Sequence, residues 1–554
     1  MKLNGSDIIC EVLLEQGVDT VFGYPGGAVL NIYDALYKYS DRITHILTAH
    51  EQGASHAADG YARSTGKTGV VIATSGPGAT NLVTGIATAM MDSIPMVAIT
   101  GNVATPALGK DSFQEVDITG ITMPITKHNF IVRDVEVLAP ILRKAFRIAR
   151  SGRPGPVLVD VPKDITAKFA EFVSEPPKEK VSYDPDSSAI AKAVRLLNEA
   201  QRPMIYAGGG VISAGASEQL MALAEKADIP VFCSLMGLGG FPSDHRLYGG
   251  LIGMHGGYGS AMATDHCDLM LVVGARFSDR VAGDTKAFGR DATIIQIDID
   301  AAEFDKNVLV DLTIRGSAED VLAQLAEDVD QNGHEGWVNQ IQRWNESIHC
   351  TQQDGDNATP EAIFDELNRL MRPDDILCTD VGQHQMWAGQ MYHFQKPRTF
   401  VSSGGLGTMG FGLGASIGSQ VGNPDKRVVL ITGDGSFHMN LNELTTLASY
   451  NLPIVVVIMN NRVLGMVRQW QKLFYGNRFS HTDPNRKTDF VKLAEAFGVT
   501  GMRITKVDEI APTLKAAFDR NGPVVIDCQI SKDVNALPMI PPGAGSDKII
   551  TEMH

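Results

Sequence analysis

Two short segments, at residues 433–436 and 460–461, carry residue types that could hold a metal ion and a phosphate. Gly433-Asp434-Gly435-Ser436 follows the run 427–432, which predicts a strand, and Asn460-Asn461 ends the next such run, 454–459. Consecutive strands of a parallel sheet present their carboxyl ends at one edge, where ligands bind. A carboxylate, an amide oxygen and a backbone carbonyl are hard oxygen ligands that suit Mg²⁺ bound to a diphosphate.

The glycines and the serine of the first segment suit the phosphate side of such a site. Gly433 and Gly435 let the backbone approach phosphate oxygens, and Ser436 is expected to open a helix whose N-terminus attracts anions. The plain structural alternative is a tight strand-to-helix turn with a polar Asn pair beside it. The motif and its spacing resemble the signature of thiamine-diphosphate enzymes.

A further candidate is His50-Glu51, where the strand predicted at 43–48 runs into a helix. A thiamine enzyme needs a carboxylate against the aminopyrimidine ring, which relays a proton to the amine that removes the thiazolium C2 proton. On its own, Glu51 would more often be a helix-start residue, because acids are favoured in the first turn. Together with the segments at 434 and 461, it is the expected activating acid.

The main competing hypothesis is a nicotinamide dehydrogenase. Gly405-Leu406-Gly407-Thr408-Met409-Gly410 matches G-x-G-x-x-G after a strand-like stretch at 399–401, and Asp434 falls at the end of the next strand, where a dinucleotide site needs an acid. Such an enzyme would use Asp434 on a ribose and would have no use for Asn460-Asn461. Two other partial motifs fail on spacing, since Tyr61 replaces the first P-loop glycine and Ala54 replaces the second zinc-protease histidine.

The elements that position these residues are predicted to form parallel sheets. Short apolar runs alternate with helical stretches throughout the chain, as expected for sheets covered on both faces. The fold class is therefore α/β, with three doubly wound parallel-sheet domains. Polar, proline-containing stretches at 171–190 and 350–360 are the expected linkers. The predicted divisions are an N-terminal domain (1–175), a central domain (190–345), a C-terminal domain (360–540) and a tail (541–554).

Composition excludes several classes of protein. The 554 residues carry a net charge of −16, which repels a nucleic-acid backbone. The first residues lack the apolar core of a signal peptide, and the longest apolar runs are far shorter than the roughly 20 residues of a membrane helix. The six cysteines include no Cys-x-x-Cys pair, which favours reduced thiols. We expect a cytoplasmic protein without nucleic-acid or membrane partners.

Many further segments give the chain a family resemblance over nearly its whole length. It resembles the catalytic large subunits of the acetohydroxyacid synthases, also called acetolactate synthases. Related thiamine enzymes share the metal motif and the early Glu but not the segments around Arg276 and Trp470. The matching segments are Phe22 to Ala28, His50 to Ala54, Thr74 to Asn81, Asp111 to Glu115, Gly152 to Val157, Gly253 to Gly256, Gly274 to Arg280, Asp380 to Trp387, the glycine run at 404–410, and Gly465 to Gln471.

The resemblance implies a role for each matching residue. Catalytic roles fall on Glu51, Gln114, Arg276, Met466 and Trp470; Arg276 would bind the acceptor carboxylate and Trp470 would contact the acceptor's alkyl group. The metal ligands would be Asp434, Asn461 and Val463. Met409 would be the bulky wedge that bends the cofactor. Cofactor contacts would come from Gly26, Gly27, Pro77, Asn81, Arg153, Gly208, Gly209, Met254, His255, Arg280, Asp298, Gln383, His384, Met409, Gly433, Gly435 and Ser436.

The implied activity is decarboxylation of pyruvate and transfer of the two-carbon unit to a second pyruvate or to 2-ketobutyrate. The implied cofactors are thiamine diphosphate, with its pyrimidine ring in the N-terminal domain and its diphosphate with Mg²⁺ in the C-terminal domain, and a structural FAD in the central domain. The family builds each site across two subunits, so we expect a homodimer or tetramer, and a small regulatory subunit is a possible partner. On sequence alone, Trp470 could instead be a packed core residue. Ser278 stands where the family usually has Asp, which leaves a flavin-free fermentative acetolactate synthase as an alternative, beside a flavin-dependent pyruvate oxidase.

Overall fold

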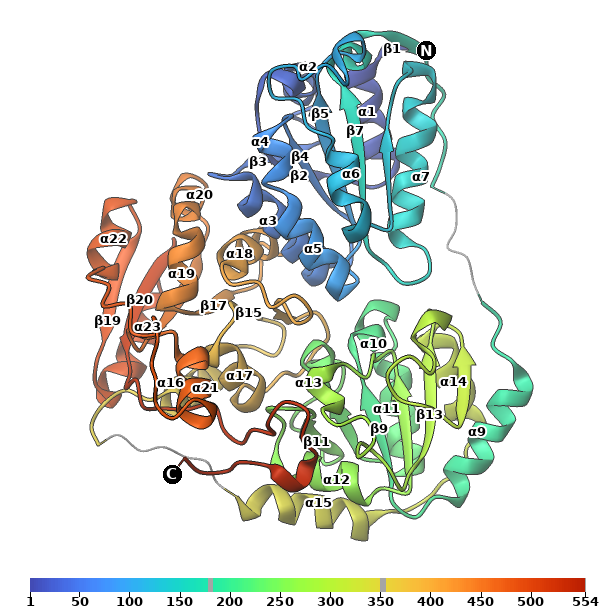
Figure 1. The fold of residues 1–554 in the computed structure, drawn as a ribbon, viewed down its shortest axis with the longest axis vertical. Helices are drawn as coiled ribbons and strands as arrows, with labels where there is room; N and C mark the ends of the chain where they lie inside the picture. Colours follow the sequence, from blue (N-terminus) through green and yellow to red (C-terminus); the bar gives the residue numbers. More distant parts are fainter. Residues whose placement is uncertain (178–182, 349–354, 554) are drawn as a thin grey trace.

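The computed structural model describes residues 1–177, 183–348 and 355–553. Within these ranges the chain forms three six-stranded parallel sheets covered by helices, arranged as three lobes (Figure 1). The predicted α/β class with three doubly wound sheets is confirmed. Residues 178–182 of the first expected linker and 350–354 of the second, Cys350 included, lie outside the described residues.

The N-terminal sheet has the strand order β3-β2-β4-β5-β7-β6. Its strands are β2 (Thr20–Tyr24), β3 (Thr44–Leu47), β4 (Gly69–Ala73), β5 (Met96–Asn102), β6 (His128–Ile131) and β7 (Pro156–Pro162). The helices around it are α1 (Gly5–Glu15), α2 (Leu30–Lys38), α3 (Glu51–Thr65), α4 (Pro77–Thr80), α5 (Val83–Asp92), α6 (Ile118–Thr122), α7 (Leu138–Arg150) and α8 (Lys163–Ala167). A short antiparallel pair, β1 (Lys2–Asn4) with β8 (Phe169–Glu171), ties the two ends of this domain together.

The C-terminal sheet repeats the same topology, with the order β16-β15-β17-β18-β20-β19. Its strands are β15 (Ile376–Thr379), β16 (Phe400–Val401), β17 (Val428–Gly433), β18 (Ile454–Asn460), β19 (Thr500–Ile504) and β20 (Val524–Gln529). Its helices are α16 (Pro360–Leu370), α17 (Gln383–Met391), α18 (Phe411–Gly422), α19 (Asp434–Asn440), α20 (Leu444–Ser449), α21 (Gly465–Phe474), α22 (Phe490–Ala496) and α23 (Ile510–Phe518). In both sheets the second strand in the chain forms one edge and the third crosses to the far side of the first.

The middle sheet differs, because its order is β11-β10-β9-β12-β13-β14. Its strands are β9 (Pro203–Ala207), β10 (Val231–Cys233), β11 (Tyr248–Leu251), β12 (Leu269–Val273), β13 (Thr293–Asp298) and β14 (Leu312–Arg315). Its helices are α9 (Ser187–Glu199), α10 (Gly209–Ala214), α11 (Ser217–Ala227), α12 (Tyr258–His266), α13 (Asp279–Ala282), α14 (Ala318–Asp328) and α15 (Glu335–Ser347). In chain order this is 3-2-1-4-5-6, the order of dinucleotide-binding folds, with the switch point between β9 and β12.

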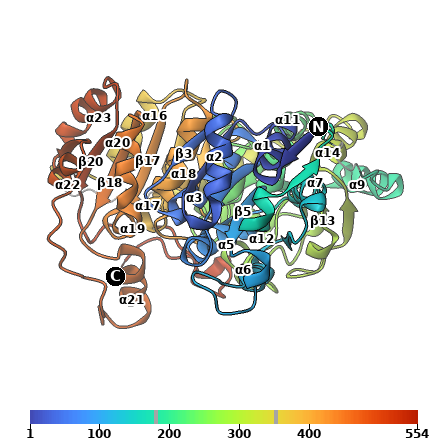
Figure 2. The same ribbon diagram turned by 90° about the horizontal axis from the view of Figure 1, so that it is seen from above.

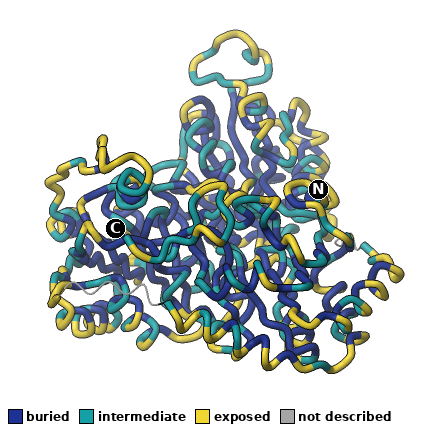
Figure 3. The backbone as a smooth tube through the Cα atoms, turned by 60° about the horizontal axis from the view of Figure 1, so that its bottom comes forward, coloured by how far each residue is buried: buried dark blue, intermediate teal, exposed yellow. Residues whose placement is uncertain are grey.

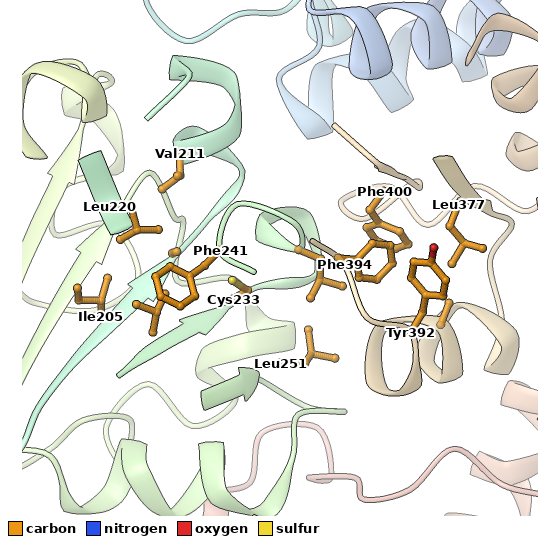
Figure 4. Close-up of a cluster of buried hydrophobic side chains, with 14 of the residues drawn as sticks. Ile205, Val211, Leu220, Cys233, Phe241, Leu251, Leu377, Tyr392, Phe394 and Phe400 are labelled. Atoms are coloured by element: carbon orange, nitrogen blue, oxygen red, sulfur yellow. The ribbon is translucent and has the colours of Figure 1, made fainter. Parts of the chain in front are cut away.

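The strands are the most deeply buried part of the molecule, while exposed residues are concentrated on outer helices and loops (Figure 3). One apolar cluster runs from the middle sheet into the C-terminal domain. In Figure 4, Phe241 and Leu251 lie on the middle-domain side, and Phe394 and Phe400 continue the cluster toward Leu377 of β15. This continuity fixes the middle domain against the C-terminal one.

The last residues of the chain pack back onto the middle domain. The N–H of Ile540 donates to the carbonyl of Met254 (2.8 Å), and the N–H of Asp284 donates to that of Ala544 (3.3 Å). Across the described ranges, no helix is both long enough and apolar enough to cross a bilayer.

The N- and C-terminal domains meet along α3 and α18, which lie side by side (Figures 1 and 2). Small residues allow the two backbones to touch. A Cβ atom at Gly418 would overlap the carbonyl oxygen of Ala57, and one at Gly60 would overlap the backbone of Ala415. The helices can therefore approach this closely only because both positions are glycine.

This packing predicts that Gly418→Ala lowers the free energy of unfolding, because α3 and α18 must separate to admit the methyl group. We expect a loss of about 1–3 kcal/mol, measured by urea unfolding of the full chain. Gly336→Ala is the matched control, because Gly336 lies in helix α15 with nothing within 4 Å of an added Cβ. It should raise stability by about 0.5–1 kcal/mol through helix propensity. Equal effects of the two substitutions would contradict the close contact.

Candidate active site

The two segments singled out at 433–436 and 460–461 meet at one edge of the C-terminal sheet. Strands β17 and β18 pair in parallel with Gly433 opposite Met459, so Asp434 and Asn461 follow neighbouring strand ends. Burial raises the pKa of Asp434 to about 6, and the backbone N–H of Asn461 opposes this by favouring the charged form. Asp434 forms no ion pair within the described ranges. A bound cation would supply the missing counter-charge.

The turn after β18 carries the other predicted oxygen ligands. The N–H of Val463 donates to Asn461 Oδ1 (3.2 Å), and Asn461 Nδ2 donates to Gln383 Oε1 (3.2 Å). Asn460 turns away, because its Nδ2 donates to Asp527 Oδ1 (2.7 Å). Among the described residues, no three His, Cys, Asp or Glu side chains cluster as metal ligands. A metal held here would therefore rely on Asp434, the amide of Asn461 and the carbonyl of Val463, a donor set that fits Mg²⁺.

Buried polar residues and glycines surround this edge. The ring of His384 lies where a Cβ at Gly433 would be, and burial lowers the pKa of His384 to about 3. A Cβ at Gly435 would meet Leu464 at 2.7 Å, with the Met409 methyl at 3.8 Å. Neighbouring side chains therefore leave no space for a Cβ at either position, which accounts for glycine at both.

Helix α19 starts earlier than expected. The sequence predicted that Ser436 opens the helix, but α19 begins at Asp434, with Gly433 as the extended N-cap residue. The Ser436 hydroxyl donates to the carbonyl of Val381 (2.7 Å) and so joins α19 to the end of β15. The prediction was wrong by two residues, because glycine at the N-cap lets the helix start directly at the strand end.

The N-terminal domain gathers the second predicted group around Glu51, the first residue of α3. Asn81 Nδ2 donates to Glu51 Oε2 (2.9 Å), which leaves Oε1 beside Gly78, whose added Cβ would lie 3.2 Å from it. Pro77 opens α4 beneath this pair. One carboxylate oxygen is thus held by an amide while the other remains available for a proton.

Gly26, Gly27 and Gln114 come to the same end of the N-terminal sheet. An added Cβ at Gly26 would meet Thr74 at about 2.5 Å, whereas Gly27 is open. Gln114 has a φ of +57° and its backbone covers Gly76, the residue before α4. Loops after β2, β4 and β5 therefore meet at this end of the sheet, and the segment after β4 contacts Glu51.

The middle sheet has its predicted residues at its switch point. A Cβ at Gly208, after β9, would collide with the carbonyl of Gly274, after β12, and Gly210 lies equally close to Gly274. Gly209 has more room, with Met236 3.3 Å from an added Cβ. Asp298 ends the next strand, and burial raises its pKa to about 6. Glycines at the crossover and an acid at the following strand end are the pattern of a dinucleotide site.

Arginines reach this switch point from two domains. Arg153, from the N-terminal domain, donates to Ser93 Oγ (2.7 Å) and pairs with Glu303 of the middle domain (2.6 Å). Arg276 is half-buried and has no ion pair in the part of the chain described. Burial, together with the charge of Arg153, lowers its pKa. An unpaired, desolvated guanidinium suits an anionic ligand.

His255 and Met254 lie where the middle domain meets the C-terminal segment. Burial lowers the pKa of His255 to about 4, and its Nδ1 has no hydrogen-bond partner within the described residues. Its carbonyl accepts from Gln390 Nε2 (2.9 Å). An orphaned ring nitrogen at this place, with the glycine contacts at 208–210 and the free Arg276, fits a bound flavin dinucleotide.

Trp470 is not a core residue. It is half-buried on α21, its indole N–H has no partner among the described residues, and its ring faces the Arg280 guanidinium at 5.6 Å. Together with Met254, Leu537 and Met539 it forms an apolar cluster that joins the C-terminal domain to the middle one. Met466, one turn earlier, packs against the large core instead. The tryptophans of the buried core are Trp337 and Trp387.

The predicted residues thus form groups on different domains. Asp434, Asn461 and Gln383 meet at one edge, and Glu51, Asn81 and Gln114 meet at another. Within the described ranges no hydrogen bond or ion pair joins Glu51 to Asp434. Arg276 lies with Arg153, whereas Arg280 is the cation that faces Trp470.

Sequence reasoning missed Asp380 as a member of the site. It ends β15 fully buried, burial raises its pKa to about 6, and it accepts from the N–H groups of Gly410 (2.7 Å) and Val381 (3.1 Å). It therefore fixes the loop that carries Met409. An acid directly after an apolar strand, the pattern that identified Asp434, could have identified it.

The dinucleotide hypothesis for residues 405–410 does not fit the structure. That segment follows β16, an edge strand, whereas a dinucleotide fingerprint follows the first strand at a switch point. The middle sheet, not the C-terminal one, has the dinucleotide order. Ser278 is the N-cap residue of the short helix α13, and its side chain makes no capping hydrogen bond.

Comparison with known proteins gives a consistent family assignment. Models of the thiamine pyrophosphate enzymes match the N-terminal TPP binding domain at residues 3–121, the central domain at 190–325 and the C-terminal TPP binding domain at 380–528.

Three relatives that match along nearly the whole chain are named as acetolactate synthase large subunits. The chain is 46% identical to an acetolactate synthase large subunit of Corynebacterium glutamicum, over 99% of this chain and 90% of the relative. It is 47% identical to a probable acetolactate synthase large subunit of Methanocaldococcus jannaschii (99% and 95%) and 44% identical to the isozyme 3 large subunit of Escherichia coli (99% and 98%). Because all three family models match and the similarity spans the chain, this protein belongs to the acetolactate synthase large-subunit family of thiamine pyrophosphate enzymes.

Proposed function

We propose that this chain is the catalytic subunit of an acetolactate synthase, which decarboxylates pyruvate and joins the two-carbon unit to a second pyruvate or to 2-ketobutyrate. The observation that carries the proposal is the pair of sites at equivalent sheet edges, Glu51 in one domain and Asp434 with Asn461 in the other. Thiamine diphosphate, when bound, supplies a thiazolium ring that accepts the electrons released by decarboxylation.

The residues of the chain divide the remaining work. Asp434, Asn461 and the Val463 carbonyl would hold Mg²⁺ and, through it, the diphosphate, with the glycines at 433 and 435 leaving space for phosphate oxygens. Glu51 would hold a proton at Oε1, because Asn81 occupies Oε2. Gln114, from the loop over Gly76, would border the same pocket.

Acceptor binding would use the cations and the apolar cluster beside the middle domain. The half-buried Arg276 has no ion pair within the described ranges and could hold a carboxylate through two parallel hydrogen bonds. Trp470 and Met254 would cover the alkyl end of the acceptor and exclude water, since both belong to one apolar cluster. FAD would lie at the switch point of the middle sheet, held by Gly208, Arg153 and their neighbours.

A second copy of the chain would complete each site. Large apolar side chains are exposed on the strands, helices and loops near the predicted residues, and such surfaces in a folded protein mark interfaces. They are Tyr24, Leu47, Met91, Phe113, Leu406 and Met439, each 40% exposed or more. A smaller regulatory subunit is also proposed, because the relatives are named as large subunits.

The function is tested by incubating the purified chain with pyruvate, thiamine diphosphate and Mg²⁺ and identifying the products by NMR. We expect CO₂ and 2-acetolactate, lost when the thiamine cofactor or Mg²⁺ is omitted. Flavin extracted from the denatured protein should be FAD, and pyruvate should not reduce it stoichiometrically. Oxygen consumption matched to CO₂, without a new carbon–carbon bond, would instead indicate a pyruvate oxidase.

Substitutions in the two halves of the site should impair activity in different ways. Glu51→Gln should lower turnover by about 10²–10⁴-fold while cofactor binding persists, because only a positioned acid is removed. Asp434→Ala should raise the Mg²⁺ and cofactor concentrations needed for half-maximal activity, because it removes an inner-sphere oxygen. Titration of each variant with both ligands separates the effects. The same change in both variants would contradict the division of roles.

The proposed acceptor site predicts different effects for substitutions at Trp470 and Arg276. Trp470→Leu should reduce the preference for 2-ketobutyrate over pyruvate about ten-fold, since one methylene in an apolar pocket is worth about 1–3 kcal/mol. Arg276→Gln should impair both products, because both acceptors carry a carboxylate. The measurement is a competition assay with both keto acids and quantification of both products. An unchanged product ratio for Trp470→Leu would remove it from the acceptor pocket.

A further inference from the structure

Two buried carboxylates outside the predicted site, Glu443 and Asp92, each accept hydrogen bonds from the backbone of the opposite domain. Glu443 follows α19 in the C-terminal domain and is fully buried. Its Oε2 accepts from the N–H of Ala49 (3.1 Å) and its Oε1 from the N–H of His50 (3.0 Å). These are the two residues before Glu51, so the carboxylate holds the turn that starts α3.

Asp92 makes the reverse contact. It is the last residue of α5 in the N-terminal domain, and its side chain has no exposed surface. Its Oδ2 accepts from the N–H of Gly404 (3.0 Å) and its Oδ1 from the N–H of Gly405 (2.7 Å). The same loop runs on to Met409. Arg63 of α3 also pairs with Asp92, at 2.9 Å.

The two contacts occupy equivalent places in the two topologies. Each carboxylate lies in the connection after the third strand of its sheet, β4 or β17. Each holds the loop after the second strand of the other sheet, β3 or β16. The helices that follow those loops, α3 and α18, pack against each other. Each domain therefore contributes one carboxylate that accepts from backbone N–H groups of the other domain, as expected if an approximate two-fold axis relates the two domains.

Space for the Glu443 contact is provided by a glycine. A Cβ added at Gly53 would overlap the Glu443 carboxylate. Thr446 Oγ1 also donates to Glu443 Oε2 (2.6 Å). Burial raises the pKa of Glu443, and the hydrogen bonds from Thr446, Ala49 and His50 oppose that rise. Three donors thus satisfy the buried carboxylate, and two of them are backbone groups of the opposite domain.

We propose that Glu443 and Asp92 are reciprocal positioning residues, Glu443 for Glu51 and Asp92 for the loop that carries Met409. The inference rests on the proposed function for what those loops do. Glu443 lies nine residues after Asp434 on one continuous segment, α19 with the turn behind it. In a dimer whose sites are shared between subunits, this segment would link the metal ligand of one site to the Glu51 of the other.

Replacing each carboxylate by the corresponding amide tests the roles of Glu443 and Asp92 separately. Glu443→Gln places an NH₂ group against a backbone N–H, so the start of α3 should loosen while the 404–409 loop stays in place. Asp92→Asn should have the opposite pattern. A displacement of about 1 Å at a reacting group can cost about 10²-fold in rate. We therefore expect Glu443→Gln to slow activation of the cofactor by about that factor.

The first measurement is amide hydrogen exchange of the full-length apoprotein, read by mass spectrometry. Glu443→Gln should speed exchange in peptides covering 44–54 and spare those covering 399–410, and Asp92→Asn should do the reverse. Gly53→Ala should mimic Glu443→Gln, since it displaces the carboxylate without removing it. Glu509→Gln is the matched control, because Glu509 also accepts from two consecutive N–H groups, those of Thr505 and Lys506, but within one domain. It should leave both peptides unchanged.

The second measurement is exchange of the thiazolium C2 proton of thiamine diphosphate in the holoenzyme without substrate, followed by quenching and NMR. Glu443→Gln should slow this exchange about 10²-fold with the cofactor still bound. Wild-type exchange in both Glu443→Gln and Gly53→Ala, or equal loosening of both peptides in each variant, would overturn the positioning role. If the wild-type protein itself fails to accelerate C2 exchange, the proposed function fails, and the peptide pattern in the apoprotein shows separately whether the carboxylates hold the loops.

Discussion

The arrangement of the molecule depends on the close packing of α3 against α18. Two helices approach to backbone contact only when no side chain stands between them, and here Gly60 and Gly418 remove the obstacle. The contact places two domains of identical strand order face to face. Because each domain carries its polar residues at the carboxyl edge of its sheet, fixing the helices also fixes both edges relative to each other.

Charged groups at the strand ends of the C-terminal and middle sheets lie in poorly solvated places. Asp434 is buried and Asp298 is half-buried, and burial raises the pKa of each to about 6, while the half-buried Arg276 has no ion pair within the described ranges. Desolvating a charge without a partner is costly, so such groups indicate ligands that complete them. A divalent cation, a diphosphate and a keto-acid carboxylate have the required charges.

The two topologies divide the binding tasks. The N- and C-terminal sheets share one order and supply the two halves proposed for thiamine, while the middle sheet has the dinucleotide order and the glycine contact between residues 208 and 274. The apolar cluster that runs from the middle sheet to Phe394 and Phe400 holds the middle and C-terminal domains together. The cluster around Trp470 adds a second junction, beside Arg280.

The sequence by itself determined the fold class, the strands that end in Gly433 and Asn460, and the candidates Glu51, Asp434 and Asn461, because strand runs and glycine spacing are local patterns. The tertiary structure supplied the physical reason that Asn461 rather than Asn460 is available, since Asn460 donates to Asp527 on another strand. The structure likewise placed Arg276 near Arg153 rather than near Trp470. It also added Asp380, Glu443 and Asp92 to the residues that position the site. Their roles depend on backbone groups that lie between 30 and nearly 400 residues away along the chain, and no local pattern encodes such contacts.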